Sequence, residues 1–137
     1  MIVQEIMTSK VESVSPEASV QETARKMREM NIGSMPVLEN GKLIGMITDR
    51  DICCRVVGEG REPASTKVRE IMSTDVSYCF NDQNASDAAQ LMEDMHIRRL
   101  AVLNRDKTIA GFLSVDDLAR HSHELAGEVL EAMGPAH

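Results

Sequence analysis

The chain has 137 residues, a hydrophobic content of 42% and a charged content of 27%, which is the composition and about the size of a single globular domain with a buried core. Its formal net charge of −7 argues against a nucleic-acid groove or an anionic membrane surface as the main partner. No apolar run approaches the roughly 20 residues of a membrane-spanning helix, and the first residues lack the pattern of a secretory signal. Three cysteines make no disulfide framework, so we expect a cytoplasmic, reducing location.

The first half of the chain predicts an extended piece, a helix, a β-hairpin and a second helix. Ser19 and Glu22 form a capping-box pattern, and apolar residues then recur at helical spacing as far as Met30. Two short apolar runs on either side of Asn40-Gly41 are typical of a β-hairpin. The expected elements are the extended piece 11–15, the first helix from 20, the strands 35–38 and 43–47, and the second helix from 49 to about 57.

The second half predicts the same order of elements. A stretch rich in Gly, Pro and Ser, residues 58–66, is typical of a connector between the halves. Asn84 and Asp87 then repeat the capping pattern ahead of a second amphipathic helix. The expected elements are the extended piece 76–80, the helix from 85, the strands 100–103 and 109–113, and the helix 115–121.

The two halves are copies of one pattern. A shift of 65 residues places Val3–Met7 on Val68–Met72, and after a one-residue slip at the hairpin turn Asp51 corresponds to Asp117. Such a duplication predicts an α/β fold of two β-α-β-β-α repeats, packed about a pseudo-twofold axis. The expected division of the chain is a first repeat, a second repeat and a C-terminal tail, at residues 1–61, 62–122 and 123–137.

Each repeat contains the pattern Gly-x-x-Thr/Ser-x-x-Asp where a strand passes into a helix. Thr48 with Asp51, and Ser114 with Asp117, fit a pair of helix N-caps, with the hydroxyl at the cap and the acid in the first turn. The same geometry also fits a binding site, because an aspartate there can accept two charge-assisted hydrogen bonds from a vicinal diol such as that of ribose. Glycines begin both patterns and would let a flat ligand approach the backbone: Gly45 and Gly111.

Two long stretches carry a family resemblance: VSPEASVQETARKMREMNIGSMPVLENGKLIGMITDRDI at 14–52 and ASDAAQLMEDMHIRRLAVLNRDKTIAGFLSVDDL at 85–118. No single motif in them is very specific, but the ordered set occurs twice. Over roughly residues 2–121 the chain resembles a tandem pair of cystathionine beta-synthase (CBS) domains, the arrangement called a Bateman module. Within that family it is most similar to small stand-alone prokaryotic CBS-pair proteins.

The resemblance implies a non-enzymatic regulatory module that requires no cofactor. Such modules have two clefts between the repeats and often bind AMP, ADP, ATP, NAD or S-adenosylmethionine as a regulatory ligand, whose ribose is held by the aspartate of the repeated pattern. The implied ribose-binding residues are Thr48, Asp51, Ser114 and Asp117. The implied adenine pockets are Ser77, Tyr78, Cys79 and Ile97, facing Thr48 and Asp51, and Ser13, Val14, Ser15, Ile32 and Gly33, facing Ser114 and Asp117.

Phosphates in the family often meet basic residues at the junction of helix and strand, which here are Arg98 and Arg99. Forked guanidinium donors suit a phosphate in an acidic protein. The alternative is a solvated pair of arginines at a helix end. Arg50, beside Asp51, is a third candidate for phosphate binding, and its alternative role is that of a solvent-facing partner for a neighbouring acid.

The expected partners are an adenine nucleotide, a second copy of the chain in a homodimer, and an unknown regulated protein, with no nucleic acid and no membrane. A purely structural dimerisation module is the main alternative, in which both Thr/Ser-x-x-Asp sets are only caps. A redox or metal-responsive role is a weaker alternative, because Cys53 and Cys54 are predicted to pack in a helix and His121 and His123 point to different faces of one. Packing is also the more ordinary role for Tyr78 and for the methionine stripe of the helices.

Overall fold

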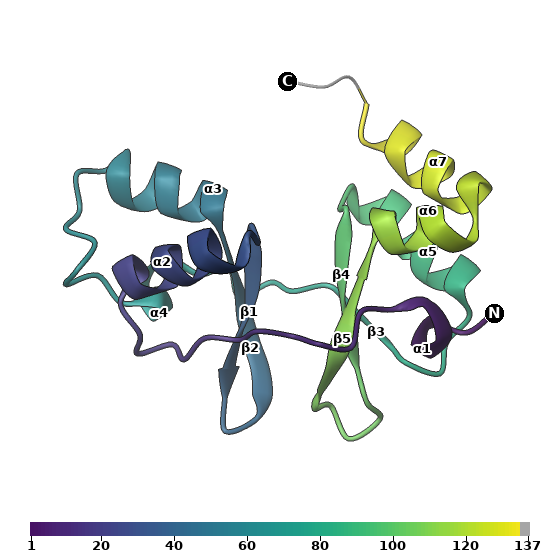
Figure 1. Cartoon of the computed structure of the whole chain (residues 1–137), viewed down its shortest axis with the longest axis horizontal. Coiled ribbons are helices and arrows are strands. Elements are labelled where there is room, and N and C mark those ends of the chain that lie inside the picture. Colours follow the sequence, from purple (N-terminus) through teal and green to yellow (C-terminus); the bar gives the residue numbers. More distant parts are fainter. Residues whose placement is uncertain (135–137) are drawn as a thin grey trace. The chain divides into compact units, whose positions relative to one another are not determined.

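The computed structural model describes residues 1–134 and divides them into two compact units. The first-repeat unit is Glu12–Val76, and the second-repeat unit combines Met1–Val11 with the chain from Ser77 onward. Figure 1 shows the helices and strands, which in chain order are α1 (Val3–Ile6), α2 (Val20–Met30), β1 (Ser34–Glu39), β2 (Lys42–Thr48), α3 (Asp49–Ile52), η1 (Cys53–Val57), α4 (Val68–Ile71), β3 (Tyr78–Phe80), α5 (Ala85–Met95), β4 (Arg99–Leu103), β5 (Ile109–Ser114), α6 (Val115–His121) and α7 (His123–Ala132). The predicted α/β class is confirmed.

The first-repeat unit is built on the antiparallel β1–β2 hairpin. Both turn residues, Asn40 and Gly41, have positive φ, as a tight hairpin turn requires. The Ser19 hydroxyl accepts a hydrogen bond from the Glu22 amide and caps α2 as expected. The predicted extended piece 11–15 contributes only an isolated parallel bridge between Val14 and β1. The predicted second helix has the expected extent, but it passes from α3 into the π-helix η1.

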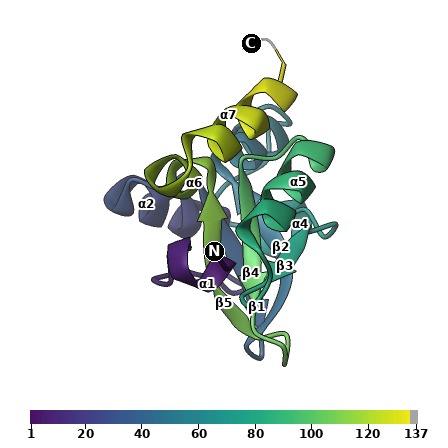
Figure 2. The same cartoon turned by 90° about the vertical axis from the view of Figure 1, so that its right-hand side faces the viewer.

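The second-repeat unit has a three-stranded sheet in the order β3-β4-β5, with β3 parallel and β5 antiparallel to β4. Asn84 is the N-cap residue of α5 as expected, but the predicted side-chain cap is wrong, because the side chain makes no capping hydrogen bond. The Asp87 amide, which it was expected to cap, donates to the Asn84 carbonyl at 3.1 Å instead. The N-terminal segment satisfies a different first-turn donor, because the Ala85 amide donates to the Met1 carbonyl. Figures 1 and 2 show α5, α6 and α7 gathered beside this sheet.

The stretch predicted as a C-terminal tail, 123–137, contains α7, and its last residues, 135–137, lie outside the described part of the chain. Ser122 caps this helix by accepting from the Leu125 amide. Ala126 and Val129 are buried in the core of the unit, and the His96 ring lies 2.7 Å from the Ala132 carbonyl oxygen. The helix therefore belongs to the folded second-repeat unit.

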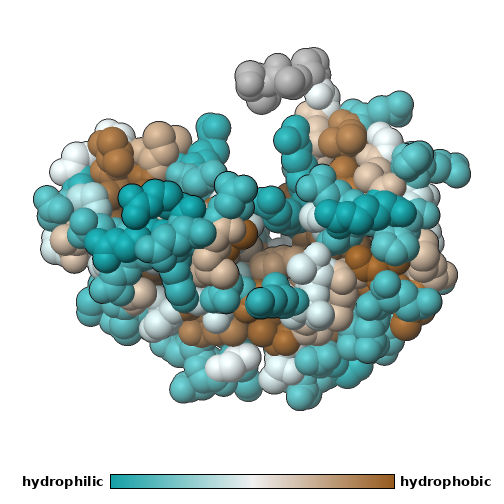
Figure 3. All heavy atoms as spheres, viewed as in Figure 1, coloured by the Kyte–Doolittle hydropathy of each residue, from teal (hydrophilic) through white to brown (hydrophobic). Residues whose placement is uncertain are grey.

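The face of the molecule seen in Figure 3 is mostly hydrophilic, with hydrophobic patches on both units. Exposed large hydrophobic side chains lie on helices of both, and they include Met30, Val57, Met95 and Leu130. No helix within residues 1–134 combines the length and the apolar character needed to cross a membrane.

The short helix that leads each repeat packs in the unit of the other repeat. In the second-repeat unit, the Val3 amide at the start of α1 donates to the Gln83 carbonyl, and in the first-repeat unit the Val68 amide at the start of α4 donates to the Ala18 carbonyl. Val3 and Val68 are both fully buried. The compact units are therefore a different division of the chain from the two sequence repeats.

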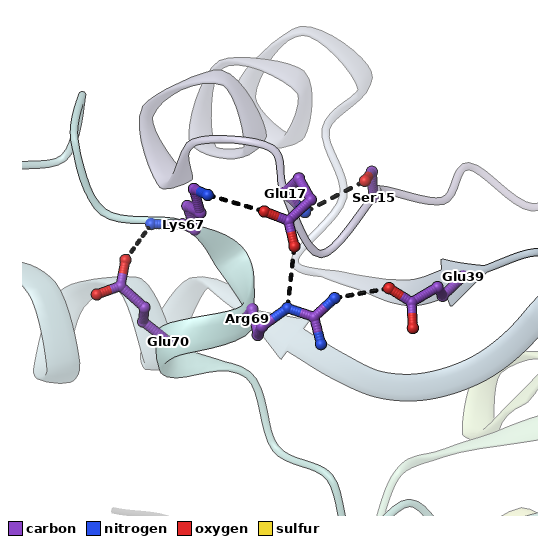
Figure 4. A network of polar contacts seen from close by, with 6 residues as sticks. All are labelled: Ser15, Glu17, Glu39, Lys67, Arg69 and Glu70. Carbon is purple, nitrogen blue, oxygen red and sulfur yellow. Dashed lines mark hydrogen bonds and ion pairs between the residues drawn. The ribbon is translucent and has the colours of Figure 1, made fainter.

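Besides these backbone contacts, ion pairs join the start of α4 to the rest of the first-repeat unit (Figure 4). Glu17 accepts from the Lys67 ammonium at 2.9 Å and from Arg69 Nε at 3.0 Å, and Arg69 also donates to Glu39 at 2.6 Å. The hydrogen bond from Lys67, and after it the one from Arg69, lowers the pKa of Glu17. These side chains are about half exposed, so salt should weaken the network.

The Glu17 network predicts that the docking of α4 depends on salt and pH. A group with a lowered pKa contributes its stability above its ordinary pKa and loses it as the pH falls through the lowered value. Glu17→Gln or 1 M NaCl should therefore speed amide hydrogen exchange in α4 at neutral pH. The amides of α1, where no ion pair is found in the described chain, are the internal control. Equal acceleration of both helices would contradict the role assigned to Glu17.

Candidate functional site

The two Thr/Ser-x-x-Asp turns have the same capped geometry. Thr48 Oγ1 accepts from the Asp51 amide at 3.0 Å, and Asp51 Oδ2 accepts from the Thr48 amide at 2.9 Å. The corresponding distances between Ser114 and Asp117 are 3.1 and 3.0 Å. The capping interpretation is therefore confirmed for both turns. It leaves room for binding, because a carboxylate has about four acceptor positions and a cap uses one.

The two aspartates differ in how many of those positions are occupied. The Asp51 side chain is 15% exposed, and its other close contact is Arg55 Nε at 3.9 Å, which is too long for a hydrogen bond. The Asp117 side chain is 5% exposed. Its carboxylate accepts from Thr8 Oγ1 at 3.1 and 3.3 Å and from Arg120 Nη1 at 2.9 Å, besides the Ser114 amide. Asp117 thus receives three hydrogen-bond donors, whereas within residues 1–134 the Asp51 carboxylate receives one, the Thr48 amide, and has more acceptor positions open.

The glycines of the two patterns make room for protein backbone, so the expected approach of a flat ligand there is wrong. A Cβ on Gly111 would lie 2.3 Å from the Thr8 carbonyl oxygen, and one on Gly45 would lie 2.8 Å from the Ser73 carbonyl oxygen. Those segments pair with the strands through Thr8–Phe112 and Met46–Ser73 bridges. Each glycine is needed because the segment that follows a leading helix crosses the strand at that point.

In the first-repeat unit, two groups of predicted adenine-pocket residues lie in different surroundings. The Gly33 carbonyl accepts from the Asp49 amide at 2.9 Å, so Ile32 and Gly33 adjoin the turn that contains Asp51. Residues Ser13, Val14 and Ser15 line a cavity of about 260 Å³ together with Ala18, Glu22, Thr23 and Lys26. Lys26 was not predicted, and its ammonium donates to the Ser13 carbonyl at 3.2 Å.

In the second-repeat unit, the predicted phosphate-binding arginines adjoin the Ser114 turn. The Val115 amide donates to the Arg98 carbonyl at 3.0 Å, and Arg99 is opposite Ser114 in the β4–β5 ladder. Arg50, at the start of α3 in the other unit, is exposed. Arg50 and Asp51 thus share one unit, and Arg98, Arg99 and Asp117 share the other.

The remaining predicted pocket residues of this unit have packing contacts. Tyr78 meets Phe80 edge to face, with ring centroids 5.7 Å apart, although it stays 40% exposed. Cys79 is buried in the core, and Ile97 packs against it. Ser77 precedes β3 and is half-buried. The combinations of residues from both repeats that the sequence suggests stay predictions.

The three cysteines are free and differ in exposure. Cys53 and Cys54 are exposed and Cys79 is buried, where burial raises the pKa of its thiol to about 11. Within residues 1–134, no group of three or more His, Cys, Asp or Glu side chains is arranged to hold a metal ion.

We expect two of the three thiols to react with a disulfide reagent at pH 8 in the native protein. Cys79 should react only after unfolding, because a thiol with a pKa near 11 is almost entirely protonated at that pH. Counting released chromophore before and after adding denaturant measures this. The Cys79→Ala variant is the control and should give the same native count of two.

Comparison with known proteins agrees with this architecture. The CBS domain family model matches residues 3–58 and again 68–124. The CBS domain-containing protein YhcV of Bacillus subtilis is 40% identical over 93% of this chain and 91% of its own length. The chain therefore belongs to the CBS-domain family, as a tandem pair, and such pairs are typically regulatory modules rather than catalysts.

Two solved structures share the fold. Hypoxic response protein 1 of Mycobacterium tuberculosis is 28% identical over 89% of this chain and 85% of its own. A crystal structure of Hypoxic Response Protein I, with two coordinated zinc ions, gives a TM-score of 0.79 at 27% identity over 88% of this chain and 98% of that one. The CBS domain pair of protein MJ0100, in complex with 5′-methylthioadenosine and S-adenosyl-L-methionine, gives 0.77 at 23% identity over 88% and 94%.

Proposed function

We propose that this CBS pair is a regulatory module that binds an adenine nucleotide (AMP, ADP, ATP or NAD), with the ribose held at the turn of Thr48 and Asp51. The observation that supports this most directly is the open carboxylate of Asp51. Its Oδ2 accepts a hydrogen bond from the Thr48 amide, and its Oδ1 is 3.9 Å from Arg55 Nε. Both acceptor positions of Oδ1 therefore suit the two hydroxyls of a ribose, which donate side by side.

Neighbouring groups support an adenosine-containing ligand. Gly33 and Ile32 adjoin the turn, and Arg50 supplies a cation two residues after Thr48. Arg98 and Arg99 stay the other proposed phosphate-binding residues. That a protein of the same fold holds 5′-methylthioadenosine and S-adenosylmethionine supports the class of ligand and leaves the individual nucleotide to experiment.

The proposed regulation is a population shift. A ligand that prefers one arrangement of the protein makes that arrangement more common, and a partner protein then meets a different surface. No cofactor takes part in this function. Three free cysteines suit a reducing, cytoplasmic location.

Thermal unfolding of ligand-stripped protein tests the proposal. Adenosine, AMP, ATP or NAD at a hundred times its dissociation constant should add about 2.7 kcal/mol to the stability. Asp51→Asn should remove that gain, since the amide loses the negative charge that accepts the diol. The control is Asp49→Asn, which makes the same charge change in the same first helical turn. No stabilisation of the wild type by any of these compounds would contradict the proposal.

The alternative is a structural module that forms homodimers without a physiological nucleotide. The observation in its favour is that Met30 and Met95, equivalent positions of the two repeats, are 41% and 49% exposed at the ends of α2 and α5. Replacing both with lysine should lower the dimer fraction in sedimentation equilibrium. If nucleotide stabilises the wild type and the substitutions leave the mass unchanged, the nucleotide proposal is favoured.

A further inference from the structure

In the second-repeat unit, the Thr8 hydroxyl donates to the Asp117 carboxylate, the group that would hold a ribose there. Thr8 Oγ1 lies 3.1 Å from Asp117 Oδ1 and 3.3 Å from Oδ2. With Arg120 on Oδ1 and the Ser114 amide on Oδ2, three donors use three of the roughly four acceptor positions, and at most one is left for the two hydroxyls of a diol. A diol cannot be accepted at Asp117 while these contacts stand.

The first-repeat unit gives an internal comparison, because Ser73 corresponds to Thr8 in the repeat. Their backbones pair alike: the Thr8 and Phe112 amides exchange hydrogen bonds of 2.8 and 2.9 Å, and the Ser73 and Met46 amides exchange two of 2.9 Å. The side chains differ, because within residues 1–134 no hydrogen bond joins the Ser73 hydroxyl to Asp51. The position of Arg120 corresponds to Cys54, which carries no charge.

We propose that Thr8 is the residue that makes the two ribose turns unequal, by acting as an internal substitute for a ribose hydroxyl at Asp117. The inference rests on the proposed function at Asp51 and adds regulation to it. The open turn takes ligand first, and the closed turn takes ligand only when Thr8 withdraws.

Withdrawal of Thr8 has a structural consequence. Thr8 lies two residues after Ile6, the end of α1, and its backbone pairs with Phe112 beside Gly111, where a Cβ would meet the Thr8 carbonyl. Moving the hydroxyl away from Asp117 therefore loosens the N-terminal segment, residues 1–11, from the second-repeat unit. Ligand at the closed turn is coupled to release of this segment, and docking of the segment competes with ligand.

Calorimetry with adenosine on the full chain tests the proposal, since adenosine has the diol but no phosphate to engage arginines. The wild type should bind one adenosine per chain and Thr8→Ala two, because alanine removes both the donor and the atom that fills the place of a ribose hydroxyl. The second site should vanish in Thr8→Ala combined with Asp117→Asn. Ser73→Ala is the matched control and should bind one, as the wild type does.

The outcomes separate this proposal from the one on which it rests. Two equally tight sites in the wild type, or an unchanged count in Thr8→Ala, would overturn the role of Thr8. No site in the wild type and one in Thr8→Ala, lost with Asp117→Asn, would support Thr8 and overturn Asp51 as the ribose site. Hydrogen exchange needs no variant: saturating the wild type at millimolar adenosine should speed exchange of the Thr8 and Phe112 amides, and slower exchange there would count against the proposal.

Discussion

Replacing Asp117 with alanine should lower the free energy of unfolding by on the order of 3 kcal/mol. Its carboxylate is nearly buried and accepts from the Thr8 hydroxyl, the Ser114 amide and Arg120. Hydrogen bonds to a charged group contribute about 1.5–3 kcal/mol each. The Arg120 side chain is 66% exposed, so solvent screening makes its contribution smaller. The substitution also leaves the Thr8 hydroxyl and the Ser114 amide without their acceptor.

Asp51→Ala is the matched control for that prediction. It removes the matching hydrogen bond from the Thr48 amide to the first-turn carboxylate, worth about 1 kcal/mol, and no hydrogen bond to the N-terminal segment. Urea unfolding of both variants gives the comparison. Equal losses of stability would show that the Thr8 and Arg120 contacts add nothing, and that the two aspartates are caps of equal weight.

Gly111→Ala should cost about 3 kcal/mol, at the upper end of overpacking substitutions. The new Cβ would lie 2.3 Å from the Thr8 oxygen and 3.1 Å from the Thr8 carbonyl carbon. Backbone cannot rotate away as a side chain can, so the N-terminal segment must move off β5. Gly45→Ala should cost less, because one of its two nearest atoms is the flexible Met72 sulfur.

Gly127→Ala is the control for the glycine series. Gly127 is inside α7, and nothing lies within 4 Å of a Cβ placed there. Alanine in a helix interior should therefore stabilise the protein by about 0.5–1 kcal/mol. Thermal unfolding of the three glycine variants measures their order of stability. A Gly111→Ala variant as stable as Gly127→Ala would contradict the close packing of Thr8 on β5.

Local signals predicted most of the elements because they act within a few residues. Asn40-Gly41 has the positive φ that a tight hairpin turn needs, and Ser19 caps α2 through the Glu22 amide. The Thr48 and Ser114 turns formed the expected reciprocal caps. The residues that form such turns and caps lie within a few positions of one another, so a single stretch of the sequence is enough to predict them.

Long-range pairing explains what the sequence did not predict. Thr8 and Asp117 are 109 residues apart, so no spacing rule predicts their contact. The sequence repeat also gives no sign that α1 and α4 each pack in the unit of the other repeat. Gly45 and Gly111 are needed because the segments that follow α4 and α1 cross the strands at these glycines. α7 was missed although Ser122 and the apolar Leu125, Ala126 and Val129 were a readable signal of a capped amphipathic helix.

Calorimetry with adenosine and 2′-deoxyadenosine tests most directly whether Asp51 holds a ribose diol. Loss of one hydrogen bond to a charged acceptor should weaken binding by about 1.5–3 kcal/mol, or roughly 10- to 150-fold. The wild type should show that preference for adenosine, and Asp51→Asn should bind both compounds equally weakly. Equal affinity of the wild type for both compounds, or an unchanged preference in Asp51→Asn, would show that Asp51 does not hold the ribose.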